Sequence, residues 1–213
     1  MKTLILYIAS FCLLSSLSAS ITPDEALKRL VEGNTRYTKD QFISPDRTSE
    51  RREALVSSQK PYAIIVGCSD SRVSPEIIFD QGIGDLFIVR VAGNVVGPIE
   101  LDSIEYSATA LGSSLVLVMG HENCGAVQAV LAGQTKDIEA VAALVEKGIA
   151  PAKNMKGNSL ENAVKLNAES VAAYLKTTPV LAQLIKEGKL QVVSGYYNLA
   201  SGKVEILPEL GSS

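Results

Sequence analysis

Two short segments of this chain carry cysteine beside residues that bind metals or handle protons. The first is CSDSR at residues 68–72, and the second is HENCG at residues 121–125, which contains the only histidine among 213 residues. Two thiolates and one imidazole are ligands that Zn²⁺ prefers, and three protein ligands leave a fourth position for water. Cys68, His121 and Cys124 are therefore candidate ligands of one zinc ion.

Asp70 and Arg72 lie beside the first of these cysteines, two residues apart. The Asp70 carboxylate could occupy the fourth metal position, or it could pair with Arg72 and leave that position to water. The simplest interpretation is an exposed ion pair in a loop, which contributes ~0–1 kcal/mol. Next to a divalent ion the same pair would switch the site between closed and open coordination, because Arg72 competes with the metal for one carboxylate.

The two cysteines also allow an interpretation without a metal. The chain has three cysteines, and Cys12 lies in an apolar N-terminal run, which leaves Cys68 and Cys124 to form a disulfide in an oxidising compartment. His121 would then be an ordinary hydrogen-bonded residue, and the protein would be an exported binding module. The patterns Cys-x-Asp-x-Arg and His-x-x-Cys are unexplained by a disulfide, so we favour the metal site.

The first twenty residues have the layout of a secretory signal peptide. Lys2 is their only charge, an apolar run extends from Leu4 to Leu14, and small residues follow around Ala19. This run is shorter than the ~20 residues that a membrane-spanning helix needs. We therefore expect residues 1–20 to be removed on export to the periplasm or the medium, leaving residues 21–213 as a single domain without a stable membrane anchor.

The elements that must position the candidate ligands are buried strands. Three apolar runs are YAIIVG at 62–67, LFIVRVAG at 86–93 and SLVLVMG at 114–120. Helix-length segments separate them, which is typical of a parallel sheet covered on both faces. Because ligand sites form at the carboxyl ends of such strands, Cys68 and His121 are expected to meet at one sheet edge.

The remaining segments complete a prediction of an α/β fold with a mainly parallel central sheet. Two helices, from Thr22 and over residues 46–58, form an N-terminal arm, and further helices are expected over 99–111, 124–131 and most of 136–176. Residues 190–207 predict a C-terminal β-hairpin on the sheet edge. A net charge of −3 and an aromatic content of 5% give no basis for binding nucleic acid.

Several segments together resemble the β-class carbonic anhydrases. They are CSDSRV at 68–73, FDQGIGDLFIVRVAGN at 79–94, IEYSATALG at 104–112 and GHENCGAV at 120–127. The resemblance implies one zinc ion per subunit, held by Cys68, His121 and Cys124. It implies that Asp70, oriented by Arg72, is either a fourth ligand or the hydrogen-bond partner of zinc-bound water.

The same resemblance implies a substrate pocket and an assembly. The pocket residues that it implies are Gln59, Phe87 and Tyr106. CO₂ is small and apolar and needs an apolar slot near the metal, for which Phe87 and Ala92 are candidates, and Gly125 is a further candidate pocket residue. The active site is expected at the interface of a homodimer or tetramer, so that Gln59, Phe87 and Tyr106 act from the neighbouring subunit.

The activity that the resemblance implies is the reversible hydration of CO₂ to bicarbonate and a proton by zinc-bound hydroxide. Zinc lowers the pKa of its bound water to ~7, which makes a hydroxide nucleophile available at neutral pH. An alternative on the same scaffold is hydrolysis of CS₂ or carbonyl sulfide, which are similar linear molecules. Because the lone histidine is a candidate ligand, protons are expected to leave through water, Asp70 or external buffer.

Overall fold

The computed structural model describes residues 21–209. The predicted signal peptide at residues 1–20, including Cys12, lies outside the described residues. No helix within 21–209 is both long enough and apolar enough to span a membrane.

A five-stranded sheet forms the centre of the molecule, with strand order β2-β1-β3-β4-β5. The strands are β1 (Ala63–Gly67), β2 (Leu86–Arg90), β3 (Leu115–His121), β4 (Gln191–Tyr197) and β5 (Val204–Ile206). The first four run parallel, and β5 pairs antiparallel with β4. The predicted parallel sheet and the C-terminal hairpin on its edge are both confirmed.

The two central strands are apolar and buried along their whole length, as strands covered on both faces must be. Strand β3 extends one residue further than predicted, because His121 continues the ladder and pairs with Tyr197 of β4. The only histidine therefore belongs to the rigid sheet and not to the loop that follows it.

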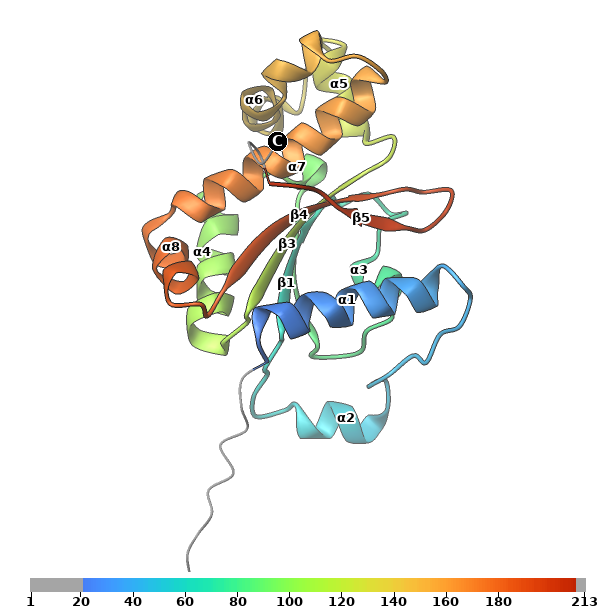
Figure 1. Cartoon of the computed structure of the whole chain (residues 1–213), viewed down its shortest axis with the longest axis vertical. Coiled ribbons are helices and arrows are strands. Elements are labelled where there is room, and N and C mark those ends of the chain that lie inside the picture. Colours follow the sequence, from blue (N-terminus) through green and yellow to red (C-terminus); the bar gives the residue numbers. More distant parts are fainter. Residues whose placement is uncertain (1–20, 210–213) are drawn as a thin grey trace, which may run out of the picture.

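Helices cover both faces of this sheet (Figure 1). They are α1 (Pro23–Tyr37), α2 (Ser49–Ala54), α3 (Pro75–Ile78), α4 (Pro98–Tyr106), α5 (Gly125–Leu131), α6 (Glu139–Ile149), α7 (Ser159–Thr177) and α8 (Pro179–Lys186). Residues of α4, α7 and α8 pack on one face of the sheet, whereas residues of α1 and α3 pack on the other. A third cluster, around α5, α6 and α7, lies at the end of the sheet where β1 and β3 terminate.

The N-terminal arm differs from its prediction in one helix. The first helix begins as expected, with the Thr22 hydroxyl accepting from the Glu25 N–H and Pro23 at the first helical position. The second was predicted over residues 46–58 but spans only Ser49–Ala54. Its start is set by Thr48, whose hydroxyl caps the Arg51 N–H, while Asp46 adopts a positive φ of 52° outside the helix.

The long helical segment predicted over 136–176 is also interrupted. Helix α6 ends at Ile149, a 3₁₀ turn follows over Ala150–Asn154, and α7 starts at Ser159. Gly157 adopts a φ of +100° and the Asn158 side chain accepts from two N–H groups at the start of α7. Pro151 lies in the 3₁₀ turn and lacks the N–H that would continue α6, while Gly157 and Asn158 set the start of α7, so the helix is interrupted despite the Ala- and Glu-rich composition. The short helices α3 and α8 were not predicted.

Gly120 allows α7 to approach the sheet closely. A Cβ atom at this position would lie 2.7 Å from the Val164 Cγ1 and 3.1 Å from the Val164 carbonyl oxygen. Any larger residue in β3 would push α7 away from the strand that carries His121.

We expect Gly120→Ala to lower the free energy of unfolding by about 1–3 kcal/mol, because the added methyl group overpacks this contact. Gly67→Ala in the neighbouring strand is the matched control, since no atom lies within 4 Å of the Cβ it would add. Chemical denaturation at fixed protomer concentration measures both. Equal losses in the two variants would contradict the close approach.

Candidate metal centre

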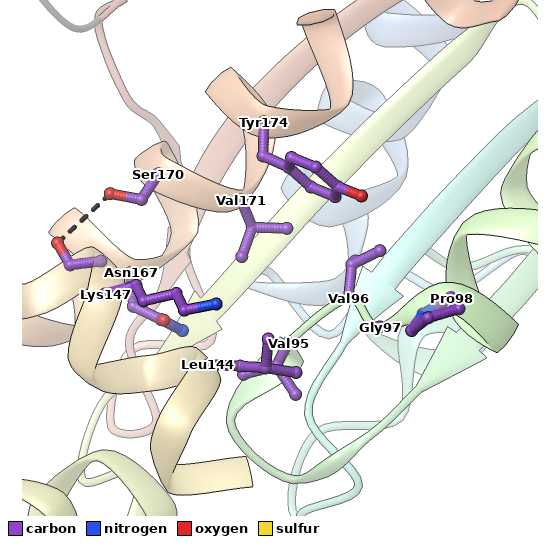
Figure 2. A pocket seen from close by; sticks show the side chains of 11 residues that line it. Val95, Val96, Gly97, Pro98, Leu144, Lys147, Asn167, Ser170, Val171 and Tyr174 are labelled. Carbon is purple, nitrogen blue, oxygen red and sulfur yellow. Dashed lines mark hydrogen bonds between the residues drawn. The ribbon is translucent and has the colours of Figure 1, made fainter. Parts of the chain in front are cut away.

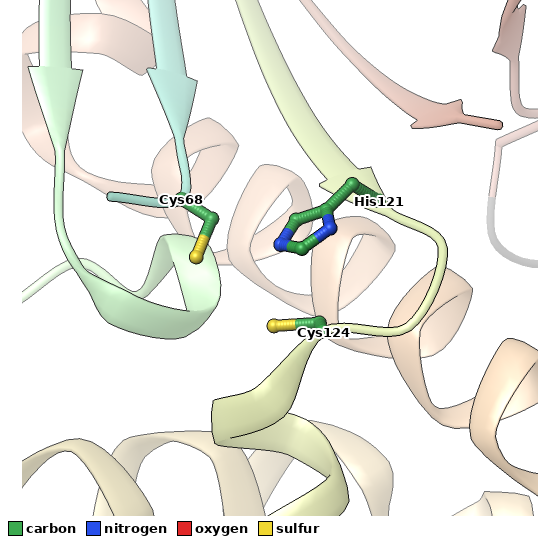
Figure 3. A group of neighbouring side chains, drawn as sticks. All are labelled: Cys68, His121 and Cys124. Carbon is green, nitrogen blue, oxygen red and sulfur yellow. The ribbon is translucent and has the colours of Figure 1, made fainter. Parts of the chain in front are cut away.

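Three ligand atoms converge where β1 and β3 end. Cys68 directly follows β1, His121 is the last residue of β3, and Cys124 caps the start of α5. Their two sulfurs and one imidazole nitrogen all lie within 4.8 Å of one another, and Figure 3 shows the three side chains pointing toward a common space. All three residues are at least 95% buried, so the predicted juxtaposition is found in the interior and not on an exposed loop.

The imidazole of His121 is oriented so that its Nε2 atom is free to bind a metal. Its Nδ1 lies 2.9 Å from the carbonyl oxygen of Glu122, which can only accept, so Nδ1 carries the proton. Nε2 is buried and has no hydrogen-bond partner among the described residues. A buried nitrogen lone pair without a donor is costly, and a metal ion in the shared space would satisfy it.

The two thiols are arranged to hold one negative charge readily and a second only beside a cation. The hydrogen bond from the Cys124 thiol lowers the pKa of Cys68, and the Gly93 N–H, 3.3 Å from the Cys68 sulfur, lowers it further. The pKa of Cys124 is raised, because its thiol is bonded to Cys68 and is buried. If both thiols were ionised, the two neighbouring thiolates would repel each other, and a divalent cation between them would offset this repulsion. The donor set of two sulfurs and one nitrogen fits zinc.

Asp70 and Arg72 form a two-pronged ion pair next to the centre. The Arg72 Nε and a terminal nitrogen donate to the two carboxylate oxygens at 2.9 and 2.7 Å. These bonds hold the pKa of Asp70 well below its usual range. Arg72 also donates to the Asn123 carbonyl at 3.2 Å, which ties the two metal-binding segments together. Of the two arrangements expected from the sequence, the structure has the one in which Asp70 pairs with Arg72.

The Asp70 carboxylate nevertheless borders the ligand atoms. Its Oδ2 lies 3.9 Å from the His121 Nε2. It is not one of the three clustered ligand atoms.

Hydrogen bonds from residues outside the predicted site hold its segments in place. Arg90 donates to the carbonyl oxygens of Cys68 at 2.8 Å and Asp70 at 2.6 Å. Asn167 donates to the carbonyl oxygen of Gly93 at 2.7 Å, and the Gly93 N–H contacts the Cys68 sulfur. The Glu122 carboxylate accepts from the Asn198 side chain and the Leu199 N–H.

The sequence carries a signal for only some of these positioning residues. Arg90 is a lone charge in the apolar run LFIVRVAG, and Glu122 lies inside the HENCG segment itself. Gly93 and Asn167 carry none, because they come together from positions 74 residues apart.

The predicted pocket residues fall into two groups. Ala92 precedes the Gly93 that bonds to Cys68, and Gly125 follows Cys124, so both border the centre. Phe87 instead pairs with Ile64, four residues before Cys68, which places it about 13 Å back along the sheet. The second group is Gln59, Phe87 and Tyr106, which lie near one another but away from the metal centre of the same chain. The Phe87 and Tyr106 ring centroids are 6.4 Å apart, and Gln59 lines the same surface hollow as Tyr106.

Comparisons with known proteins agree with this centre. The profile of the carbonic anhydrase family matches residues 63–204. A carbonic anhydrase of Mycolicibacterium smegmatis is 37% identical over 203 residues, which cover 89% of this chain and 95% of the relative. The solved β-carbonic anhydrase CcaA has a TM-score of 0.68 at 26% identity, covering 85% of this chain and 95% of that one. The chain belongs to the β-class carbonic anhydrase family.

Two further solved structures share this fold. One is the Coccomyxa β-carbonic anhydrase in complex with acetazolamide, with 27% identity, a TM-score of 0.65 and coverage of 85% and 86%. The other comes from a pair of tetrameric β-carbonic anhydrases of Sordaria macrospora, with 23% identity, a TM-score of 0.65 and coverage of 83% and 90%. The latter likeness concerns the fold alone.

The family hydrates CO₂ with zinc, and the enzyme described here is a zinc-dependent carbonic anhydrase. Its Cys68 and Cys124 are free thiols, so the metal-free, disulfide-bonded module considered from the sequence is not the arrangement found.

We expect Cys124→Ala to reduce the zinc content from about one ion per chain to below about a tenth, because it removes one of three ligands. The matched comparison is Asp70→Asn, which should keep its zinc, since Asp70 is tied to Arg72. Elemental analysis of the purified variants measures both. A loss of zinc in Asp70→Asn as complete as in Cys124→Ala would show that Asp70 is a required ligand.

Proposed function

We propose that Cys68, His121 and Cys124 hold the zinc ion with which the enzyme interconverts CO₂ and bicarbonate. The observation that carries this proposal is the buried convergence of two sulfurs and the unpartnered Nε2 of His121 within 4.8 Å. Zinc bound there would supply an activated water as the nucleophile at neutral pH.

Asp70 and Arg72 would orient the reacting water. The Asp70 carboxylate borders the ligand atoms and its low pKa keeps it ionised at neutral pH, so it accepts a hydrogen bond and is a poor store for protons. Arg72 holds this carboxylate through two hydrogen bonds and thereby keeps it away from the metal position. Ala92 and Gly125, beside the centre, would form the near wall of the CO₂ pocket.

The far wall of the pocket would come from a neighbouring copy of the chain. Phe87 and Tyr106 contact each other but lie away from the chain's own centre, and Tyr106 is 52% exposed. They lie on or next to β2, which is the edge strand of the sheet opposite the hairpin. A homodimer formed along this edge would bring Gln59, Phe87 and Tyr106 to the partner's zinc, and pairs of dimers would make a tetramer.

The place of action would be outside the cytoplasm. This part of the proposal depends on the signal-peptide pattern of residues 1–20, which predicts release into the periplasm or the medium. N-terminal sequencing of the protein secreted by its host tests it, with a mature start near residue 21 as the expected result.

The activity is tested by stopped-flow CO₂ hydration with the zinc-loaded enzyme. We expect Asp70→Asn to lower kcat/KM by about 10²-fold, because the water loses its oriented acceptor. Asp24→Asn, which removes an exposed carboxylate at the start of α1, should leave the rate unchanged. Hydrolysis of CS₂ or carbonyl sulfide by an enzyme that is inactive on CO₂ would contradict the proposal in favour of the alternative substrates.

Turnover should depend strongly on buffer. The lone histidine is fully buried and bonded within the centre, so no imidazole of the described chain is free to carry protons to solvent. At fixed pH and ionic strength, we expect kcat to rise several-fold with imidazole buffer concentration before it saturates. A kcat that stays constant over this titration would show that proton transfer to buffer does not limit turnover.

The shared active site is tested with a heterodimer purified through two different tags. One subunit carries Cys124→Ala, and the other carries Gln59→Ala with Tyr106→Ala. Each parental homodimer should be nearly inactive, whereas the heterodimer has one intact site and should recover about half of the wild-type rate. A heterodimer no more active than its parents would contradict the contribution of Gln59 and Tyr106 from the partner.

A further inference from the structure

A second hollow lies apart from the metal centre, between α6, α7 and the segment that leads into α4 (Figure 2). Its volume is about 390 Å³, at the lower end of the ~300–1,000 Å³ range of small-molecule pockets. Val95, Val96, Leu144 and Val171 form an apolar wall. We call this hollow the α6–α7 pocket.

One cation and no anion line the α6–α7 pocket. Lys147 is the only charged residue among those that line it, and it has no ion-pair partner among residues 21–209. Figure 2 shows its side chain reaching into the space between Leu144 and Val171. An ammonium group beside an apolar wall favours a ligand that has an anionic head and an apolar body.

A buried polar atom on the same wall also lacks a partner. Asn167 is 1% exposed, and its Oδ1 has no hydrogen bond among the described residues. The nearby Ser170 hydroxyl is already committed to the Gly148 carbonyl at 3.2 Å. Since buried acceptors are normally satisfied and a carboxylate can only accept, we expect a water trapped beside the occupant of the pocket to donate to this atom.

We propose that the α6–α7 pocket binds a small monocarboxylate with a compact apolar body, such as an aryl-substituted acetate. The carboxylate pairs with Lys147, and the apolar body packs between Leu144 and Val171. Bicarbonate alone has no apolar body and leaves this wall uncovered, so the proposed ligand differs from the substrate of the metal centre.

The pocket is connected to the metal centre through one side chain. The Nδ2 of Asn167 donates to the Gly93 carbonyl at 2.7 Å, and the Gly93 N–H in turn points at the Cys68 sulfur at 3.3 Å. A molecule bound in the pocket therefore lies against Asn167, which positions Gly93. It does not touch the metal-binding residues Cys68, His121 and Cys124.

The test uses the zinc-loaded full-length enzyme and phenylacetate as the probe, with 2-phenylethanol as its uncharged match. Methyl-group NMR of valine and leucine locates the binding site. We expect saturable shifts at Val95, Val96, Leu144 and Val171 with phenylacetate, and an affinity at least about threefold weaker for the alcohol. Because the readout is the position of the shifted methyl groups, it is independent of CO₂ hydration.

Two variants and one control sharpen this test. Lys147→Met should weaken phenylacetate binding about three- to tenfold by removing the cation, and Val171→Phe should abolish it by filling the pocket. Lys186→Met, which removes an exposed lysine at the end of α8, should bind like the wild type. The proposal is overturned if these methyl groups show no saturable shift, or if Lys147→Met and Lys186→Met bind phenylacetate equally well.

Discussion

Two buried thiols and a buried imidazole nitrogen, all within 4.8 Å of one another, impose the constraint on which this structure depends. Both sulfurs must lose their protons to bind a metal, but two neighbouring thiolates in the interior repel each other and lose their hydration. The opposite pKa shifts of Cys68 and Cys124 express this conflict. A divalent cation would resolve it, because one ion would compensate both charges and could take the unpartnered Nε2 of His121 as a third ligand.

The fold holds the three candidate ligands in place through the elements that surround them. Cys68 and His121 are fixed by adjacent parallel strands, and the glycine at position 120 lets α7 press on the second of them. Arg90 fixes the backbone on either side of Ser69 through two carbonyl groups, and Asn167 fixes Gly93. Ligand geometry in metal sites depends on such outer contacts nearly as much as on the ligands. Arg72 adds a bridge between the two metal-binding segments.

The features that could be predicted from the sequence, the strands and the candidate ligands, are determined by residues close together in the chain. The strands are continuous apolar runs, and the ligand residues follow them directly, so strand ends and ligands could be inferred together. The break between Ile149 and Ser159 was missed, because helix-favouring composition over 136–176 outweighed the local signals of Pro151, Gly157 and Asn158. Asn167 was missed for a different reason: its contact with Gly93 joins positions 74 residues apart, and neither residue is marked by its neighbours. The separation of Phe87 from the centre follows from the register of β2 on β1, which residue spacing does not specify.

The zinc ligands are tested most directly by X-ray absorption at the zinc edge of the purified, metal-loaded enzyme. The arrangement of Cys68, His121 and Cys124 predicts two sulfur neighbours at ~2.3 Å and lighter nitrogen or oxygen neighbours at ~2.0–2.1 Å. A spectrum with no sulfur shell, or with a single sulfur neighbour, would show that the two cysteines do not share the ion and would contradict the proposed centre.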